Sequence, residues 1–252
     1  IAEEATGCVE FRNVSFSYPG AEEAAISNVS FSARPGEVTA IIGGTGSGKS
    51  TLVNLIPRFY DLDSGSIKVD GIDIREMTQK ELRRKIGFVS QNPVIFSGTV
   101  DDNIRFGNPD ASREDVIRAA QTAQALEFID VLPEGINSQV AQGGTNLSGG
   151  QKQRISIARA LVRKPEIYIF DDSFSALDYR TDALLRAALR EETRHSTVII
   201  VAQRVGTVMN ADQIIVMDEG RVVGIGSHED LVARNQVYRE IVLSQLAEEE
   251  IA

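Results

Sequence analysis

The sequence has little cysteine, no long apolar run and no surplus of positive charge. Cys8 is the only cysteine, so no disulfide can form within the chain, which fits a reducing compartment. No run of about 18 apolar residues is present, and no signal peptide is visible at Ile1, so we expect no segment that spans a membrane. The net charge of −10 argues against nucleic acid as the main partner.

The chain also lacks low-complexity tracts and internal repeats. Its 252 residues are 42% hydrophobic, which suits one large domain or two small ones with a sizeable core. What the chain does contain is an alternation of strand and helix patterns around one glycine-rich stretch.

That stretch, residues 43–50, reads GGTGSGKS and fits the phosphate-binding P-loop pattern G-x-x-x-x-G-K-[ST]. A β-branched run at 38–42 precedes it and a helical segment at 51–56 follows it, which is the strand–loop–helix setting that the motif needs. Glycines let backbone N–H groups turn toward a phosphate, and the helix N-terminus adds partial positive charge. The pattern predicts nucleotide binding by Gly43, Thr45, Gly46, Ser47, Gly48, Lys49, Ser50 and Thr51.

Metal-binding groups are expected beside this loop. Lys49 can reach the β- and γ-phosphates, and the Ser50 hydroxyl can hold Mg²⁺. Residues 167–172 form an apolar strand that ends in Asp171 and Asp172, the Walker B pattern. Asp171 is therefore predicted to hold Mg²⁺ through its water shell.

Two other predicted strands, 86–91 and 197–203, end in the amides Gln91 and Gln203. Strand ends face the ligand crevice in an open α/β sheet, so Gln91 could reach Mg²⁺ or an attacking water. The plain alternative is a loop amide. Tyr18 ends an earlier strand and could stack on adenine, or it could be only a strand-end aromatic.

The strand and helix patterns predict an α/β fold. Strands at 9–18 and 26–31 alternate apolar and polar residues, which suggests a small antiparallel sheet beside a parallel core. Residues 99–163 show helical periodicity with few strand signals, so we expect an inserted α-helical subdomain. The α/β core would then comprise about 1–98 and 164–252, and it would end in a helix over 229–246.

A second anion-binding pattern, LSGGQ, occupies residues 147–151. Ser148 and Gln151 fit a capping box that opens a helix, which could be its whole role. However, Gly149 and Gly150 leave the first-turn amides open to an anion. One chain does not need two phosphate clamps, so the second could meet a nucleotide bound to another subunit.

Together these motifs resemble the nucleotide-binding domain of an ATP-binding-cassette (ABC) transporter over nearly the whole chain. LSGGQ is the signature that separates this family from other P-loop ATPases. Residues 55–61 and 93–100 resemble the exporter branch. The resemblance matches Tyr18 to the A-loop, 43–50 to Walker A, Gln91 to the Q-loop, Asp171 to Walker B, and 175–178, ending in Asp178, to the D-loop.

The resemblance implies an ATPase domain at the cytoplasmic face of the cell membrane, with ATP and Mg²⁺ as cofactors. Two such domains would pair head to tail, so that Ser148–Gln151 and Asp178 of one subunit help to enclose nucleotide at the dimer interface. A membrane domain, normally on the same polypeptide, would dock its coupling helices at the Q-loop and the helical subdomain. This chain would then be the C-terminal half of a longer exporter.

Two catalytic positions depart from the family pattern. Asp172 stands where active members carry a Glu that orients the attacking water, and Gln203 stands where they carry a switch His. The shorter side chain withdraws the carboxylate by about 1 Å, and misplacement of that size can cost about a hundredfold in rate. Gln cannot become a cation or shuttle a proton. Gln142, before the signature, replaces a Glu common in exporters.

The departures favour a degenerate site in a heterodimeric exporter. That site would bind ATP and hydrolyse it slowly, while the intact signature completes a competent site on a different partner subunit. Three alternatives stay open: a homodimeric ATPase with normal turnover, a nucleotide-gated structural module, and a soluble relative in translation or DNA repair. The last lacks support, because the chain has neither a second cassette nor a long coiled coil, and its charge offers no nucleic-acid surface.

Overall fold

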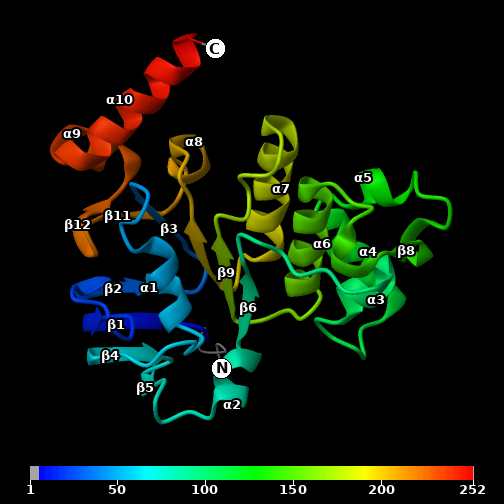
Figure 1. The fold of residues 1–252 in the computed structure, drawn as a ribbon, viewed down its shortest axis with the longest axis horizontal. Coiled ribbons are helices and arrows are strands. Elements are labelled where there is room, and N and C mark those ends of the chain that lie inside the picture. Colours follow the sequence, from blue (N-terminus) through cyan, green and yellow to red (C-terminus); the bar gives the residue numbers. More distant parts are fainter. Residues whose placement is uncertain (1–5, 252) are drawn as a thin grey trace.

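The structure is a computed structural model that describes residues 6–251 (Figure 1). A six-stranded sheet, in the order β12-β11-β3-β10-β9-β6, forms its centre, and a four-stranded sheet lies beside it in the order β2-β1-β4-β5. The central strands are β3 (Val38–Gly43), β6 (Ile86–Val89), β9 (Ile167–Asp171), β10 (Thr197–Val201), β11 (Gln213–Asp218) and β12 (Arg221–Gly226).

The central sheet is parallel except at its β12 edge, where β12 pairs antiparallel with β11. Every residue of β9 and β10 is buried, because helices and the second sheet cover both faces. Strand ends that share a direction meet at one edge of a sheet. The P-loop, the carboxylates after β9 and the amides after β6 and β10 therefore gather at the carboxyl edge of this sheet.

The second sheet is antiparallel, as the alternating strands predicted. Its inner face packs with α1 against one face of the central sheet, and Phe11 stacks on Phe31 with ring centroids 4.5 Å apart. Ile41 points into this core, whereas its neighbour Ile42 points into the core on the other face. The strands are β1 (Val9–Phe16), β2 (Ile26–Ala33), β4 (Ser64–Val69) and β5 (Ile72–Asp73).

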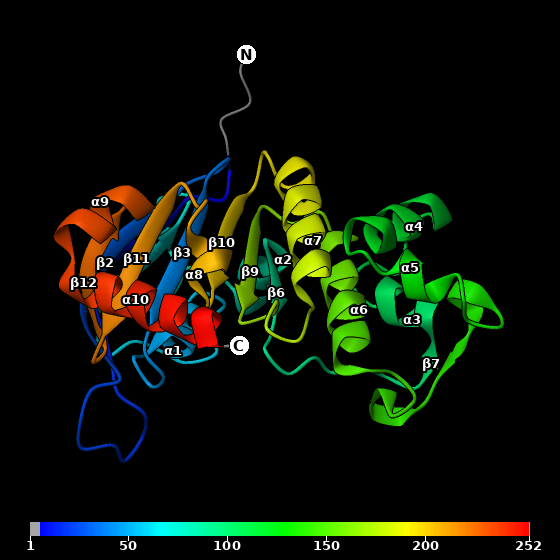
Figure 2. The same ribbon diagram turned by 90° about the horizontal axis from the view of Figure 1, so that it is seen from above.

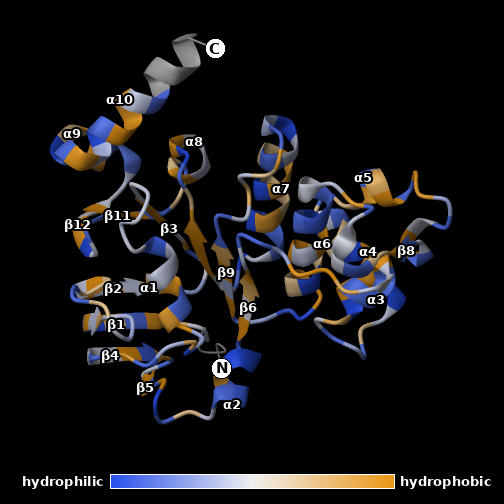
Figure 3. Cartoon of the chain, viewed as in Figure 1, coloured by the Kyte–Doolittle hydropathy of each residue, from blue (hydrophilic) through white to orange (hydrophobic). Residues whose placement is uncertain are grey.

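The helical part lies beyond the β6 edge of the central sheet, with α3, α4 and α5 on the side of α6 away from that sheet (Figure 2). Apolar colour concentrates on the central strands, and polar colour on outward helix faces (Figure 3). The helices are α1 (Lys49–Leu55), α2 (Gln79–Arg84), α3 (Val100–Arg105), α4 (Arg113–Thr122), α5 (Leu126–Ile129), α6 (Gly149–Leu161), α7 (Tyr179–Glu192), α8 (Val205–Val208), α9 (His228–Arg234) and α10 (Gln236–Ile251). Among residues 6–251, no helix combines the length and the apolarity that a membrane span requires.

Several predicted elements differ from the structure. The expected C-terminal helix is broken at Asn235, whose backbone is extended and whose side chain accepts a hydrogen bond from Tyr238 N at 2.8 Å. Gln91, Gln203 and Tyr18 lie just beyond the strands that were expected to contain them. The helical segment also holds a two-stranded pairing of β7 (Gly98–Thr99) with β8 (Gln139–Val140), which is too short to leave a periodic pattern in the sequence.

Candidate nucleotide-binding site

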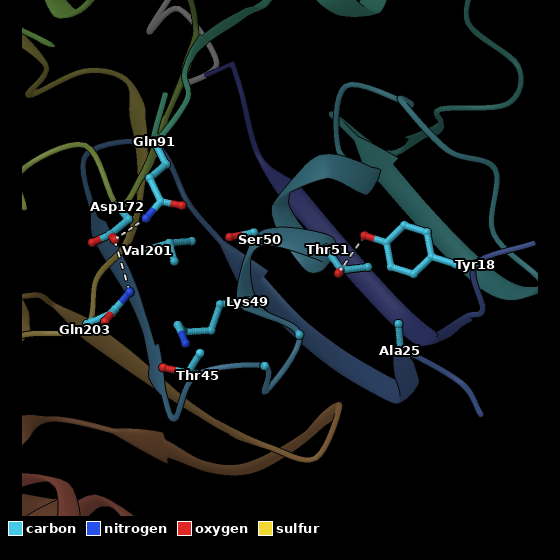
Figure 4. Close-up of a pocket in the computed structure, with 12 residues that line it drawn as sticks. Tyr18, Ala25, Thr45, Lys49, Ser50, Thr51, Gln91, Asp172, Val201 and Gln203 are labelled. Carbon is cyan, nitrogen blue, oxygen red and sulfur yellow. Dashed lines mark hydrogen bonds between the residues drawn. The ribbon is translucent and has the colours of Figure 1, made fainter. Parts of the chain in front are cut away.

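The loop between β3 and α1 forms a tight cradle (Figure 4). Gly46 and Gly48 have φ of 78° and 96°, a left-handed conformation that glycine adopts without steric cost. A Cβ on Gly48 would lie 2.8 Å from the carbonyl oxygen of Ala25, so no larger residue fits there. Ser47 is held from the other side, because its carbonyl accepts a hydrogen bond from Gly220 N at 3.1 Å.

Lys49 lies buried under this cradle. Its Nζ donates to the carbonyl oxygens of Gly43 and Gly44 at 2.9 and 2.7 Å. Burial lowers the pKa of Lys49, while the charges of Asp172 and Asp171 act in the opposite direction. A phosphate oxygen would give this buried cation the counter-charge that the loop carbonyls supply only in part.

The Walker B carboxylate faces the start of α1. Ser50 Oγ donates to Asp171 Oδ1 at 2.9 Å. Burial raises the pKa of Asp171, and the Ser50 hydrogen bond and the Lys49 charge oppose that rise. A hydroxyl and a carboxylate are hard oxygen donors of the kind Mg²⁺ prefers. No cluster of three or more His, Cys, Asp or Glu residues gathers in the described part of the chain, so Mg²⁺ here would also need phosphate oxygens and water.

Three side chains meet at the carboxyl ends of neighbouring strands. Asp172 Oδ2 accepts one hydrogen bond from Gln91 Nε2 at 3.0 Å and another from Gln203 Nε2 at 3.2 Å (Figure 4). Asp172 has a φ of 46°, a conformation in which Asp is enriched. Burial raises the pKa of Asp172, and the charges of Lys49 and Arg204 lower it, together with the two amides. No sequence motif includes Arg204, so its effect on the pKa of Asp172 was not predicted.

An aromatic wall closes the cleft opposite this cluster. The Tyr18 hydroxyl lies 2.9 Å from Thr51 Oγ1, and Tyr18 as a residue is 37% exposed. Phe16 and Tyr60 contact that ring edge to face, at centroid distances of 5.0 and 5.3 Å. Because Thr51 belongs to the first turn of α1, the hydroxyl contact ties the aromatic wall to the phosphate cradle. Tyr18 therefore lines the cleft next to the phosphate cradle, and its predicted stacking on adenine stays a prediction.

Tyr18→Ala is expected to weaken ATP binding by about 5- to 150-fold, because stacking of a base on an aromatic ring contributes about 1–3 kcal/mol. Tyr18→Phe keeps the aromatic ring and should weaken ATP binding far less than Tyr18→Ala does. Calorimetric titration with ATP and with tripolyphosphate measures both effects. Tripolyphosphate has no base, so an equal loss of its affinity in Tyr18→Ala would contradict the stacking role.

The cleft has a volume of about 400 Å³ and is lined by twelve residues. Ten of them are predicted site residues, and Ala25 and Val201 are additions that no motif indicated. Ser47 is buried beneath the loop, and Gly43 ends β3. The predicted residues on the cleft wall are Tyr18, Thr45, Gly46, Gly48, Lys49, Ser50, Thr51, Gln91, Asp172 and Gln203.

The structure does not bring the signature or Asp178 to this cleft. Within residues 6–251, the cleft wall contains none of Ser148, Gly149, Gly150, Gln151 or Asp178. The capping box is present and opens α6, which lies on the far side of β9 from α1 (Figure 1). The Asp178 carboxylate caps α7 by accepting hydrogen bonds from the N–H and hydroxyl of Thr181, which also lower its pKa.

The glycine cradle, its buried lysine and the Ser50–Asp171 pair define a P-loop nucleotide-binding domain. Residues 26–175 match the family model described as ABC transporter. The chain belongs to the ABC transporter family.

Relatives of this chain agree with that assignment. An ABC transporter ATP-binding protein of Mycobacterium tuberculosis is 48% identical over 95% of the chain and 41% of its own length. The ATP-dependent lipid A-core flippase of Pseudomonas fluorescens is 44% identical over 95% of the chain and 40% of its own length. A solved structure of a bacterial Atm1-family ABC exporter with ATP bound has a TM-score of 0.91 at 41% identity, over 95% of this chain and 42% of that one. This chain therefore spans about two fifths of the length of these proteins.

Proposed function

We propose that the chain is the ATP-binding domain of an ABC exporter and couples the binding and hydrolysis of ATP to export. The similarity to a flippase and to an Atm1-family exporter with ATP bound supports the exporter class. The site supports the nucleotide, because Tyr18, the loop around Lys49 and the Ser50–Asp171 pair provide a base platform, a phosphate cradle and oxygen donors for Mg²⁺. Gln91 would add its amide oxygen to that donor set.

The same proposal includes two partners. A second nucleotide-binding domain would pair head to tail with this one, and a transmembrane domain would dock on it at the cytoplasmic face of the membrane. The position of the signature supports the pairing. Ser148 and Gly149 are exposed at the start of α6 and away from the cleft of their own chain. The Ser148 N–H donates to Gln151 Oε1 at 2.9 Å, whereas the N–H groups of Gly149 and Gly150, in the first turn, need a partner from outside the helix and could bind an anion on another subunit.

This chain's own site is proposed to bind ATP and hydrolyse it slowly, as the degenerate site of a heterodimer. The observation that carries this proposal is the double hydrogen bond to Asp172 Oδ2 from Gln91 and Gln203. Hydrogen bonds to a carboxylate stabilise its charged form and so weaken it as a base. The Gln203 amide stays neutral at every pH, so it cannot stabilise transition-state charge as an imidazolium can.

A complementation experiment tests the heterodimer. One copy would carry Asp172→Glu and Gln203→His, to restore its own site, and Ser148→Arg, to block its signature. This copy is mixed with the natural chain and Mg-ATP. The mixture should release phosphate about tenfold faster than the sum of the rates of the two proteins measured separately. This gain is part of the roughly hundredfold increase in rate expected from a correctly placed carboxylate. The natural chain would supply the only intact signature to the restored site.

The matched control repeats the mixture with a natural chain that carries Ser148→Arg alone. This control should show no gain, because neither subunit then has an intact signature. A mixture rate equal to the sum of the separate rates, at concentrations where sedimentation shows pairing, would refute the complementary roles.

One observation favours the ordinary homodimeric ATPase. Burial raises the pKa of Asp172, which makes it a better base than an exposed aspartate would be. The rate of phosphate release from the natural chain decides between the two functions.

A further inference from the structure

A glutamine of the C-terminal helix contacts one backbone group in the loop that follows β10 and another at the first residue of α8. Gln245 Nε2 donates to the carbonyl oxygen of Gln203 at 2.7 Å, and Gln245 Oε1 accepts from Val205 N at 2.7 Å. Gln245 lies on α10, which runs past α8 in Figure 2. One side chain from the end of the chain therefore clamps a loop at the edge of the nucleotide cleft.

The clamp replaces a helix cap. Helix α8 begins at Val205, and its N-cap residue Arg204 makes no side-chain hydrogen bond to the first turn. The first N–H groups of a helix have no partner within that helix and need one from outside. Gln245 satisfies the N–H of Val205, which fixes where the loop ends and where α8 begins.

The clamped loop carries the residue that reaches Asp172. Gln203 is an exposed residue, and its side chain donates to Asp172 Oδ2 at 3.2 Å. Its backbone is set by β10 on one side and by Gln245 on the other, since Ala202 N donates to Ile41 O at 3.1 Å. Gln203 therefore accepts a hydrogen bond from α10 at its backbone carbonyl and donates one to the carboxylate from its side chain.

We propose that Gln245 is a positioning residue, through which α10 sets the direction of Gln203 toward Asp172. The kinetic consequence rests on the proposed function of this site in ATP hydrolysis. The positioning itself does not, because it is a property of the loop without nucleotide. A merely structural role, in which Gln245 only docks α10, would affect stability and leave the Gln203–Asp172 pair unchanged.

The first arm of the test measures hydrogen exchange by mass spectrometry in the 252-residue chain without nucleotide. Gln245→Ala should speed exchange at Val205 by about tenfold, the effect of losing one well-made hydrogen bond. Gln245→Glu keeps the acceptor for Val205 N but loses the donor to Gln203. That variant should keep Val205 protected. Unchanged exchange at Val205 in Gln245→Ala would overturn the proposal.

The second arm measures single-turnover phosphate release from Mg-ATP, which reports even on a slow site. Both Gln245 variants should lower the rate by about three- to tenfold, with ATP affinity within about twofold of the natural chain. In a Gln203→Ala background, Gln245→Ala should change the rate no further, because Gln203 then has no side chain to direct. An equal loss of rate in that background would show that Gln245 acts only through stability.

The matched control is Gln236→Ala, the same substitution on the same helix. Gln236 donates to Glu240 on the same helix, at 2.9 Å, and its substitution should leave both exchange at Val205 and the rate unchanged. The two proposals fail in different ways. Fast ATP hydrolysis by the natural chain would refute the proposal that this site is slow. It would not affect the exchange result at Val205, or the prediction that the effect of Gln245→Ala on the rate requires the Gln203 side chain.

Discussion

Replacing Asp172 by Glu together with Gln203 by His should raise phosphate release from Mg-ATP by about a hundredfold. The added methylene moves the carboxylate by about 1 Å toward the attacking water, and errors of that size cost about a hundredfold. The imidazole can carry a positive charge beside the γ-phosphate, which the amide cannot. Replacing Gln203 also removes one of the two amide hydrogen bonds that the carboxylate at position 172 accepts in the natural chain.

The rate should be measured at high protein concentration, where pairing is favoured, with the natural chain and the double variant side by side. Asp110→Glu with Gln121→His is the matched control, because it makes the same two changes at exposed positions. Equal and fast phosphate release from the natural chain and the double variant would mean that Asp172 and Gln203 support normal ATP hydrolysis. The chain would then be better described as an ordinary symmetric ATPase.

Lys49→Ala should weaken ATP binding by about 10- to 100-fold. A hydrogen bond to a charged group contributes about 1.5–3 kcal/mol, and Lys49 is the buried cation of the phosphate cradle. The change also removes the hydrogen bonds to the carbonyls of Gly43 and Gly44, so the loop itself should lose order.

Equilibrium titration with ATP measures this loss, and circular dichroism checks that the variant is folded. Lys80→Ala is the control, since Lys80 is exposed on α2 and away from the cleft, and it should bind as the natural chain does. ATP affinity in Lys49→Ala within twofold of the natural value would contradict the phosphate role of Lys49.

These two experiments separate binding from chemistry. The residues that would hold base, phosphate and metal follow the family pattern, whereas the departures lie at Asp172 and Gln203, which contact each other. Under the function proposed above, we expect binding to stay intact in this chain while its own hydrolysis is slow.

The sequence by itself determined the class of fold and predicted ten of the twelve residues that line the cleft. The spacing of GGTGSGKS between a β-branched run and a helical segment predicted the cradle, because glycines at Gly46 and Gly48 meet a backbone requirement that is local. Strands buried on both faces leave continuous apolar runs, so β9 and β10 and the polar residues after them were visible without coordinates.

Only the tertiary structure decided which of these side chains touch. The contacts that form the site join residues far apart in the chain. Tyr18 contacts Thr51, both Gln91 and Gln203 contact Asp172, and Gln245 contacts the loop after β10. No local pattern encodes them, because each depends on where packing of the two cores places separate elements. The break in the C-terminal helix at Asn235 has the same origin. The Asn235 side-chain amide donates a hydrogen bond to the carbonyl oxygen of Val223 in β12. A tertiary contact therefore accompanies the point where a segment with helical periodicity is interrupted.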